Sequence, residues 1–476
     1  MNFKTRIQVV PQEEYSRVHE GSLRLLEEMG VVFEWDEAVE ICKKAGLKTN
    51  GKKVFFPRKA VESALASLPK QYEWKAINPE RNVIIGGDDV ILQPPFGTVY
   101  VQEGDGTHRR GTLEDYRNFQ ILCHDLPGVQ VSGSLPITPN DTTEKERYLR
   151  IMYENLKHSD KPTIAVLTNY KQCEEVLDLV ELAAGKKLGD NEYYCSVAVD
   201  PLSPMKWSPE SCQTMVAYAK RRQPMFFLPC AMAGATGPIS LMGTATLQNA
   251  EILSALTFTQ LISPGMPSVY GPASSTVYMK NASYITGTPE MMLINNINLQ
   301  MGREFYNLPT RTMCGMTSSK IVDAQAGFET MQNLMMGILG GAHILNESIG
   351  ILDEIMSVSF AKVIIDHELV NRVVRILKGV YANDFDSDLS LDTIMDVGHN
   401  GTYLTHENTF AHYRGRWNPS VSTWDSYSAW EKAGSEDIVQ KAEKQYKDIL
   451  AQAPEMVCDS GLNKDMQVFI KKALGE

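Results

Sequence analysis

The sequence lacks a run of apolar residues long enough to cross a membrane. No stretch of 18 residues is both uncharged and apolar, and the start at residues 1–6 has no apolar segment of the kind found in signal peptides. Basic residues are outnumbered, because 58 Asp and Glu against 46 Lys and Arg give a net charge of −12. This balance argues against nucleic acid as a ligand. We therefore expect a cytoplasmic protein that binds neither membranes nor nucleic acid.

Several sequence motifs of common cofactor sites and catalytic centres are also missing. No G-x-G-x-x-G follows an expected strand and no G-x-x-x-x-G-K-[ST] is present, so the loops that hold dinucleotides and nucleoside triphosphates are absent. There is no G-x-S-x-G, the turn that carries the nucleophile of α/β-hydrolases. The eight cysteines form no C-x-x-C pair and are most simply reduced thiols. His406 and His412 lie six residues apart rather than four, so we expect no metal site there.

The first 115 residues mix helical and strand patterns. Apolar side chains recur at helical spacing over 12–29, Gly30 follows as a helix stop, and a second helix is expected over 36–45. Short strand-like runs follow at 54–56, 83–85, 90–92 and 98–101. The pattern predicts an N-terminal α+β section over residues 1–115.

From residue 116 to about 380, apolar strand-like runs alternate with helical stretches. The expected strands are 129–135, 163–167, 194–199, 225–228, 268–271, 310–314 and 342–345, and the expected helices are 142–158, 171–184, 208–221, 243–262, 288–305, 320–338 and 359–378. Such alternation is typical of an α/β fold with a parallel sheet. An eighth strand would close a TIM-type (βα)8 barrel, but the pattern does not place it.

Three of the expected strands run into loops rich in proline and small residues. The loops are DPLSP at 200–204, CAMAGATGP at 230–238 and GPASS at 271–275. In parallel α/β folds, ligands bind at the C-terminal ends of the strands. Glycine and proline also serve turns alone, but the loops favour a binding site at this end of the barrel.

Residues 381–476 have a different composition. An acidic stretch over 384–392 precedes an aromatic, histidine-rich run over 398–430. We expect a C-terminal helical and aromatic extension that wraps the barrel or makes a contact between subunits. Trp417, Trp424 and Trp430 would suit such an interface, so we expect a homo-oligomer.

Several separated segments occur in an order that resembles a known family. They are SLRLLEEMG at 22–30, AGATGP at 233–238, PTRTMCGMTSSK at 309–320, DAQAGFE at 323–329, GH at 398–399 and TYLTH at 402–406. With these segments the sequence resembles the trimethylamine methyltransferase family, specifically its members that lack pyrrolysine and demethylate quaternary amines. The resemblance implies a TIM-type barrel and transfer of a methyl group to the cobalt of a separate corrinoid protein.

The founding members of this family carry pyrrolysine near the position of Gly315 or Met316, where this sequence has only standard residues. A quaternary ammonium loses its methyl group to Co(I) and leaves as a neutral tertiary amine, so it needs no proton donor. Unprotonated trimethylamine would have to leave as an amide anion. We therefore expect a quaternary amine substrate, with glycine betaine and proline betaine ranked first, and no catalytic residue beyond those that position it. The cobalamin is expected on the partner, because the chain lacks the Asp-x-His-x-x-Gly signature of corrinoid domains.

A trimethylammonium group has no N–H donor, so aromatic faces are its natural ligands. The aromatic candidates near the barrel mouth are Phe96, Tyr100, Trp207, Phe227 and Tyr270. The polar candidates are Asp200 for the cation and Arg311, His343 and Glu347 for or around a carboxylate. Each of these side chains could instead serve core or loop packing.

Two other functions remain open from the sequence alone. A barrel lyase or hydrolase could use His343 with Asp200 or Glu347 as acid and base, and it would act without cobalamin. A non-catalytic betaine-binding protein would keep affinity for the ligand and form no demethylated product.

Overall fold

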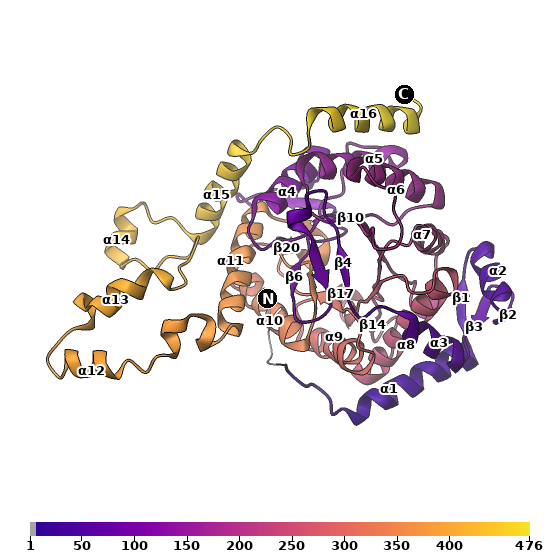
Figure 1. Ribbon diagram of the computed structural model, residues 1–476, viewed down its shortest axis with the longest axis horizontal. Coiled ribbons are helices and arrows are strands. Elements are labelled where there is room, and N and C mark those ends of the chain that lie inside the picture. Colours follow the sequence, from indigo (N-terminus) through magenta and orange to yellow (C-terminus); the bar gives the residue numbers. More distant parts are fainter. Residues whose placement is uncertain (1–5) are drawn as a thin grey trace.

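The computed structural model describes residues 6–476, and the first five residues, part of the segment in which we expect no signal peptide, lie outside the described range. Parallel strands lie at the centre of the body and helices surround them (Figure 1). One parallel sheet has the order β15–β13–β11–β10–β9, and a second has the order β18–β19–β6. The bounds are β6 Ile91–Leu92, β9 Ser132–Gly133, β10 Thr163–Ala165, β11 Cys195–Val199, β13 Met225–Phe227, β15 Ser268–Tyr270, β18 Arg311–Met313 and β19 Ile344–Asn346. Parallel single-residue bridges join the two sheets, Tyr270 with Thr310 and Leu92 with Val129.

A helix follows each of these strands. They are α4 Leu113–Asp125, α5 Glu144–His158, α6 Tyr170–Ala184, α7 Pro209–Lys220, α8 Leu241–Ile262, α9 Pro289–Gln300, α10 Ala324–Gly340 and α11 Phe360–Leu377. The expected alternation of strands and helices from residue 129 onward is thus confirmed. The additional parallel strand is β6, which pairs with β19 and comes from the run that the sequence pattern groups with the N-terminal section.

Local signals set the boundaries of the helices. α4 starts at a capping box in which Thr112 and Asp115 satisfy each other's backbone N–H groups. α6 ends at Gly185, whose φ of 63° is the left-handed conformation that glycine adopts without strain.

The N-terminal section covers one end and one side of the strands. Its elements are α1 Glu13–Arg24, a π-helical turn Leu25–Met29, β1 Val31–Phe33, α2 Asp36–Lys44, β2 Lys48–Asn50, β3 Lys53–Phe55, α3 Arg58–Ser67, β4 Tyr72–Trp74 and β5 Val83–Ile85. Trp74 of the β4–β5 hairpin is fully buried, packs edge-to-face on Phe226 at 5.6 Å and donates a hydrogen bond to the Tyr194 carbonyl. Because Tyr194 precedes β11, the hairpin covers the N-terminal ends of the strands.

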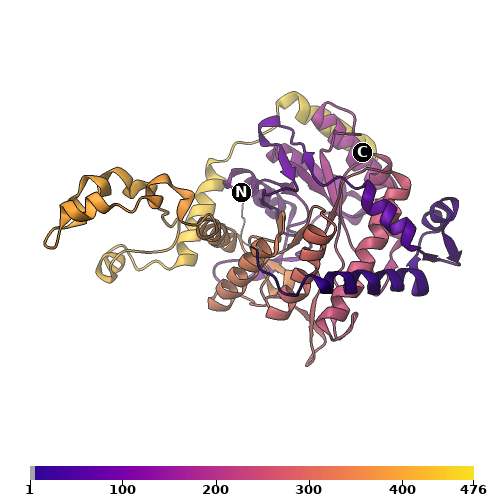
Figure 2. The same cartoon turned by 60° about the horizontal axis from the view of Figure 1, so that its bottom comes forward.

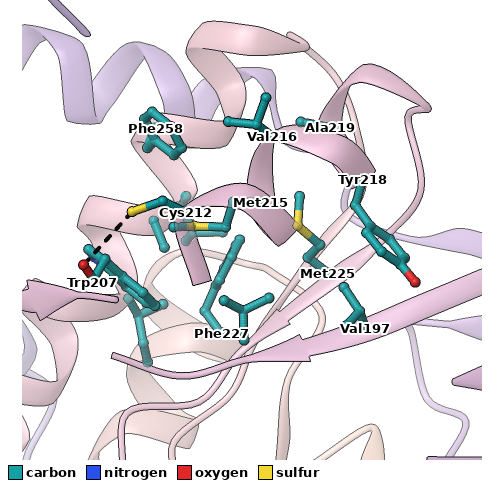
Figure 3. Close-up of a cluster of buried hydrophobic side chains, with 14 of the residues drawn as sticks. Val197, Trp207, Cys212, Met215, Val216, Tyr218, Ala219, Met225, Phe227 and Phe258 are labelled. Atoms are coloured by element: carbon teal, nitrogen blue, oxygen red, sulfur yellow. Dashed lines mark hydrogen bonds between the residues drawn. The ribbon is translucent and has the colours of Figure 1, made fainter. Parts of the chain in front are cut away.

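Side chains of the central strands alternate between an inner and an outer face, as the period of two requires. Ala198, Phe226 and Val269 are in register and belong to the inner cluster, which also contains Ile164 and Ile344. The next residues along those strands, such as Phe227, face the surrounding helices. Figure 3 shows Phe227 among outer side chains, including Trp207 and Met215.

The C-terminal extension has two parts. Residues 380–436 form an arm that projects from the body (Figures 1 and 2) and carries short helices α12 Leu391–Val397, α13 Glu407–His412 and α14 Tyr427–Lys432. The chain then returns to the body, where α15 Ile438–Gln452 packs on α11 and α4, and α16 Ser460–Leu474 packs on α6 and α5. No helix within residues 6–476 is long and apolar enough to cross a membrane.

Replacement of Phe226 by alanine should lower the free energy of unfolding by about 3 to 5 kcal/mol, because it leaves a cavity in the inner cluster. Phe226 is fully buried and packs against Trp74. Urea unfolding followed by circular dichroism measures the change. A loss below about 1 kcal/mol would contradict a filled strand interior at this position.

Candidate functional site

Four charged or reactive side chains come together where the central strands end. Asp200 follows β11, Cys230 follows β13, Arg311 begins β18 and Glu347 follows β19. The charges of Asp200, Glu347 and Arg311 all act on the Cys230 thiol, and those of Arg311 and Glu347 act on the Tyr284 hydroxyl. Segments far apart in the sequence therefore build one polar cluster at the C-terminal ends of the strands, where parallel α/β folds carry their sites.

Protein atoms crowd around this cluster although solvent reaches part of it, and we call this region the recess. Cys230 and Asp200 are exposed to solvent, yet desolvation raises the pKa of the Cys230 thiol and of the Asp200 carboxyl. The raised pKa of Cys230 keeps this side chain as a neutral thiol, which is a poor nucleophile.

Arg311 is the centre of the recess. Its side chain is 1% exposed, and its Nη2 lies 3.8 Å from Oε1 of Glu347, beyond hydrogen-bond distance. No group in residues 6–476 accepts a hydrogen bond from Nε or Nη1 of Arg311. Burial lowers the pKa of Arg311 and raises that of Glu347, although each charge favours the other. Buried donors without partners mark a place where a ligand or water completes the hydrogen bonding.

Gly271 gives Arg311 its space. A Cβ at residue 271 would lie 2.9 Å from Cδ of Arg311 and 2.7 Å from the Phe227 carbonyl oxygen. Any larger residue there would push the arginine side chain aside.

Two amide side chains add polar capacity next to this arginine. Gln93 directly follows β6, and Asn346 ends β19; both are 1% exposed. Within the described chain, Oε1 of Gln93 and both amide atoms of Asn346 are without hydrogen-bond partners. The sequence analysis missed both residues. The only signal for them is position, because each lies at the end of a strand.

Tyr284 is an aromatic side chain whose hydroxyl lies within the field of Arg311 and Glu347. It lies on β17 Ser283–Ile285, which forms a hairpin with β16 Ser275–Tyr278 after β15, and it is partly exposed. Its hydroxyl donates a hydrogen bond to the Ala273 carbonyl at 3.1 Å. The sequence analysis missed Tyr284, because this hairpin carries no conspicuous motif.

Three aromatic candidates from the sequence are not brought to this recess. Trp207, Phe227 and Tyr270 are fully buried in the outer layer. The Trp207 indole donates to Ser254 Oγ at 3.0 Å, and the Tyr270 hydroxyl donates to Asn249 Oδ1 at 2.6 Å. The strand positions of Phe227 and Tyr270 point toward the helices, so proximity to a strand end does not bring them to the inner face.

The other two aromatic candidates follow β6. Phe96 is partly exposed and forms a bridge with Leu135 in the segment after β9, so it lies near the ends of the strands. Tyr100 lies farther along, on β7 Tyr100–Gln102, and its ring stacks on His108 of β8 His108–Arg110 with 4.3 Å between centroids. That stacking occupies one face of the Tyr100 ring.

His343 lies at the opposite end of its strand from Glu347. It precedes β19, Nδ1 accepts a hydrogen bond from the Thr310 N–H at 3.0 Å, and Nε2 lies 3.0 Å from the Gly87 carbonyl. Nδ1 therefore carries no proton, and Nε2 also lies 2.7 Å from Nη1 of Arg303. Burial lowers the pKa of His343 to about 3. The structure therefore does not bring His343 together with Asp200 or Glu347 as an acid–base pair.

Glu251 on α8 holds the loop that follows Asp200, and the sequence analysis did not identify it. Its carboxylate accepts hydrogen bonds from Ser203 Oγ at 2.9 Å and from the Met205 N–H at 2.7 Å. Burial raises the pKa of Glu251 to about 7.

The recess offers groups of both charges and no activated nucleophile. Arg311 can bind an anion, while Asp200, Glu347 and the ring of Tyr284 can face a cation. Residues 6–476 contain no group of three or more His, Cys, Asp or Glu placed to hold a metal ion. The arrangement suits binding and orientation of a zwitterion.

Comparisons with known proteins identify the family of the chain. The family described as trimethylamine methyltransferase (MTTB) matches residues 2–475. The glycine betaine methyltransferase of Desulfitobacterium hafniense (strain Y51) is 34% identical over 474 residues, covering 98% of each chain. The proline betaine:corrinoid methyltransferase of Eubacterium limosum is 30% identical over 401 residues, covering 82% of this chain and 81% of its own.

A solved structure is similar in fold. The monomethylamine methyltransferase MtmB of Methanosarcina barkeri has a TM-score of 0.52 at 11% identity, covering 94% of this chain and 90% of its own. At this identity the likeness concerns the fold alone. The match of the family over almost the whole sequence goes further: the chain belongs to the trimethylamine methyltransferase family.

Proposed function

We propose that this protein transfers a methyl group from a quaternary amine of the glycine betaine or proline betaine class to the Co(I) of a corrinoid protein. The observation that carries the proposal is the buried Arg311, whose Nε and Nη1 have no acceptor in residues 6–476 and which lies in a recess with carboxylates and an aromatic ring. The names of the two betaine methyltransferases of Desulfitobacterium hafniense and Eubacterium limosum support the same substrate class.

Each end of a betaine has a counterpart in the proposed site. Arg311 binds the carboxylate, with Glu347 beside it. Asp200 and the rings of Tyr284 and Phe96 face the ammonium group, which aromatic faces attract by about 0.5 to 2 kcal/mol each. We assign Tyr100, Trp207, Phe227, Tyr270 and His343, which were also candidates, to packing and support.

The proposed reaction needs orientation more than proton transfer. The electron pair of Co(I) forms the new bond to the methyl carbon, and the electrons of the broken C–N bond stay on nitrogen, which leaves as a neutral tertiary amine. Holding the methyl group in line with the acceptor is then the main task of the chain. This chain holds no cofactor of its own in the proposal; the cobalamin is carried by the partner.

We further propose a TIM-type (βα)8 barrel that begins with β6, because two bridges join both edges of the parallel sheets. This would move the start of the barrel from residue 116 to about residue 90, with the extension still beginning near residue 381.

The eight free cysteines support a reducing compartment, the cytoplasm. A homo-oligomer is supported by the arm, which exposes large apolar side chains including Tyr381, Leu404 and Tyr427.

Exposed apolar side chains follow five of the central strands and support the docking of a partner at this end of the strands. Each comes from the segment, or the beginning of the helix, that follows one of the strands β11, β13, β15, β18 or β19. They are Leu202, Ile239, Met279, Ile321, Phe328 and Met356. Together they offer an apolar rim for a protein that must approach the substrate.

The reaction is tested by mixing the purified protein with free Co(I) cobalamin and each candidate substrate. Growth of methyl-Co(III) absorbance with glycine betaine or proline betaine, and none with trimethylamine, is the expected result. Demethylated product without cobalamin would favour a different enzyme class, and no reaction with any betaine, with or without a cognate corrinoid protein, would refute the proposal.

Replacement of Arg311 by methionine retains an unbranched apolar stem, although a shorter one, and removes the guanidinium charge. Loss of charge-assisted hydrogen bonds worth about 1.5 to 3 kcal/mol should raise KM for the betaine roughly 10- to 150-fold. Initial rates with Co(I) cobalamin measure KM, and the inhibition constant of tetramethylammonium, which has no carboxylate, serves as the control. Equal weakening of both ligands would contradict a role for Arg311 in carboxylate binding.

Affinity for the substrate should depend on pH through Asp200. Desolvation raises the pKa of Asp200 above its ordinary value, whereas a bound cation favours the ionised form. KM should therefore increase as the pH falls through the pKa of Asp200, and Asp200→Asn should remove this dependence. Because Glu251 titrates near pH 7, a Glu251→Gln variant separates its contribution. An unchanged pH profile in Asp200→Asn would contradict the assignment.

Phe328→Asp should impair transfer to the corrinoid protein and leave transfer to free cobalamin unchanged, because a charge in the apolar rim opposes docking but lies outside the recess. Phe328 is 64% exposed, and Val468 on α16, at 67%, gives a matched control as Val468→Asp. An increase of roughly tenfold or more in KM for the corrinoid protein is expected. The rim has no such role if both variants behave alike.

A further inference from the structure

Glu347 adopts a backbone conformation that is unusual for its residue type. Its φ is 48°, in the left-handed region, and Gly350 three residues later has a φ of 85°. A residue with a side chain is held in this region only when its surroundings impose it. The turn 346–350 carries the carboxylate that lies beside Arg311, so its backbone determines where that carboxylate points.

Gly315 packs directly against this turn. A Cβ at residue 315 would lie 2.1 Å from the Glu347 carbonyl oxygen and 2.7 Å from the Ser348 carbonyl carbon. Backbone atoms cannot move aside as the end of a flexible side chain can. The neighbouring Cys314 N–H donates to the Asn346 carbonyl at 2.9 Å, so the segment after β18 and the turn after β19 lie against each other.

A buried ion pair fixes the other end of the turn. Oδ2 of Asp366 on α11 accepts hydrogen bonds from the Gly350 N–H at 2.7 Å and from Lys362 Nζ at 2.6 Å. The side chains of Lys362 and Asp366 are each 1% exposed, and Lys362 also donates to Thr330 of α10 at 2.9 Å. The turn is therefore tied to two helices of the outer layer.

A third tether reaches the strand on the other side of β19. Ser348 Oγ donates a hydrogen bond to the Gln93 carbonyl at 3.2 Å, in the segment that directly follows β6. The turn thus has fixed contacts with the ends of both strands that flank β19. Such support from several elements is what keeps a binding group in one geometry.

We infer that Gly315 and Asp366 are positioning residues for carboxylate recognition: they hold the Glu347 turn so that Glu347 orients Arg311 and leaves its Nε and Nη1 free for the substrate carboxylate. The inference rests on the proposed function and deepens it. The absence of a side chain at residue 315 then contributes to selectivity: it favours quaternary amines that carry a carboxylate over those that do not.

Gly315→Ala tests the contact at one end of the turn, with Gly337→Ala as the matched control. A Cβ at residue 337 would lie 2.3 Å from Cys314 Sγ, so the control is also crowded, but none of the three atoms nearest to that Cβ belongs to Glu347. In Gly315→Ala we expect KM for glycine betaine to rise about tenfold or more while kcat and the inhibition constant of tetramethylammonium stay within about threefold of wild type. The control should leave this ratio of ligand affinities unchanged.

A second variant removes the tether at the other end without leaving a buried charge. Lys362→Met combined with Asp366→Leu replaces the ion pair by apolar side chains of similar size, an exchange that folded proteins often tolerate. It frees the Gly350 N–H and should shift the same ratio in the same direction. Circular dichroism and thermal unfolding identify variants that retain the fold.

The outcomes separate the inference from the proposed function. Absence of methyl transfer in the wild-type protein with every betaine refutes the proposed function itself. An active wild type together with folded variants that weaken betaine and tetramethylammonium equally, or weaken neither, overturns the positioning role alone.

Discussion

The burial of Arg311 is the constraint on which the organisation of this site depends. A guanidinium with 1% exposure needs space, a counter-charge and acceptors for its donors. Gly271 provides the space, and Glu347 provides a counter-charge at 3.8 Å. Nε and Nη1 still have no acceptor in residues 6–476, so these residues do not satisfy all the hydrogen-bond donors of the guanidinium. A third group, supplied by a ligand or by water, must do so.

The order of strands and helices could be predicted from the sequence because short apolar runs alternate with stretches of helical length from residue 129 onward. The 22 residues of α8 and the five of β11 leave little ambiguity. β6 could not be placed, because two residues carry no periodic signal and the run resembles the hairpin strands around it. Its parallel partner β19 lies more than 250 residues away, and only the folded chain reveals that pairing.

The site was predictable where chemistry and strand position coincide. Asp200, Arg311 and Glu347 are charged residues at strand ends, and the structure brings them together. Phe227 and Tyr270 also lie at strand ends, but a strand has two faces and a shift of one residue exchanges them. The sequence of a strand buried on both faces does not reveal which face is inner, because apolar residues occupy both. Cys230 was missed because it lies in a loop, and Tyr284 because it lies on a three-residue strand of a short hairpin; neither segment shows a period that links position to direction.

The direction of the pKa shifts bears on the class of ligand. Burial raises the pKa of Asp200 and Glu347 and lowers that of Arg311, so each charged form in the recess is disfavoured by desolvation. A simple cation would stabilise the carboxylates and leave the donors of Arg311 without an acceptor. A simple anion would do the reverse. A zwitterion supplies an opposite charge to both sides at once and keeps the net charge of the recess unchanged, so it offsets the cost of burying these groups without adding a new unpaired charge. The same reasoning explains why a rigid Glu347 turn matters in the proposed site: if Glu347 moved to a full salt bridge with Arg311, the arginine would lose much of its attraction for a carboxylate.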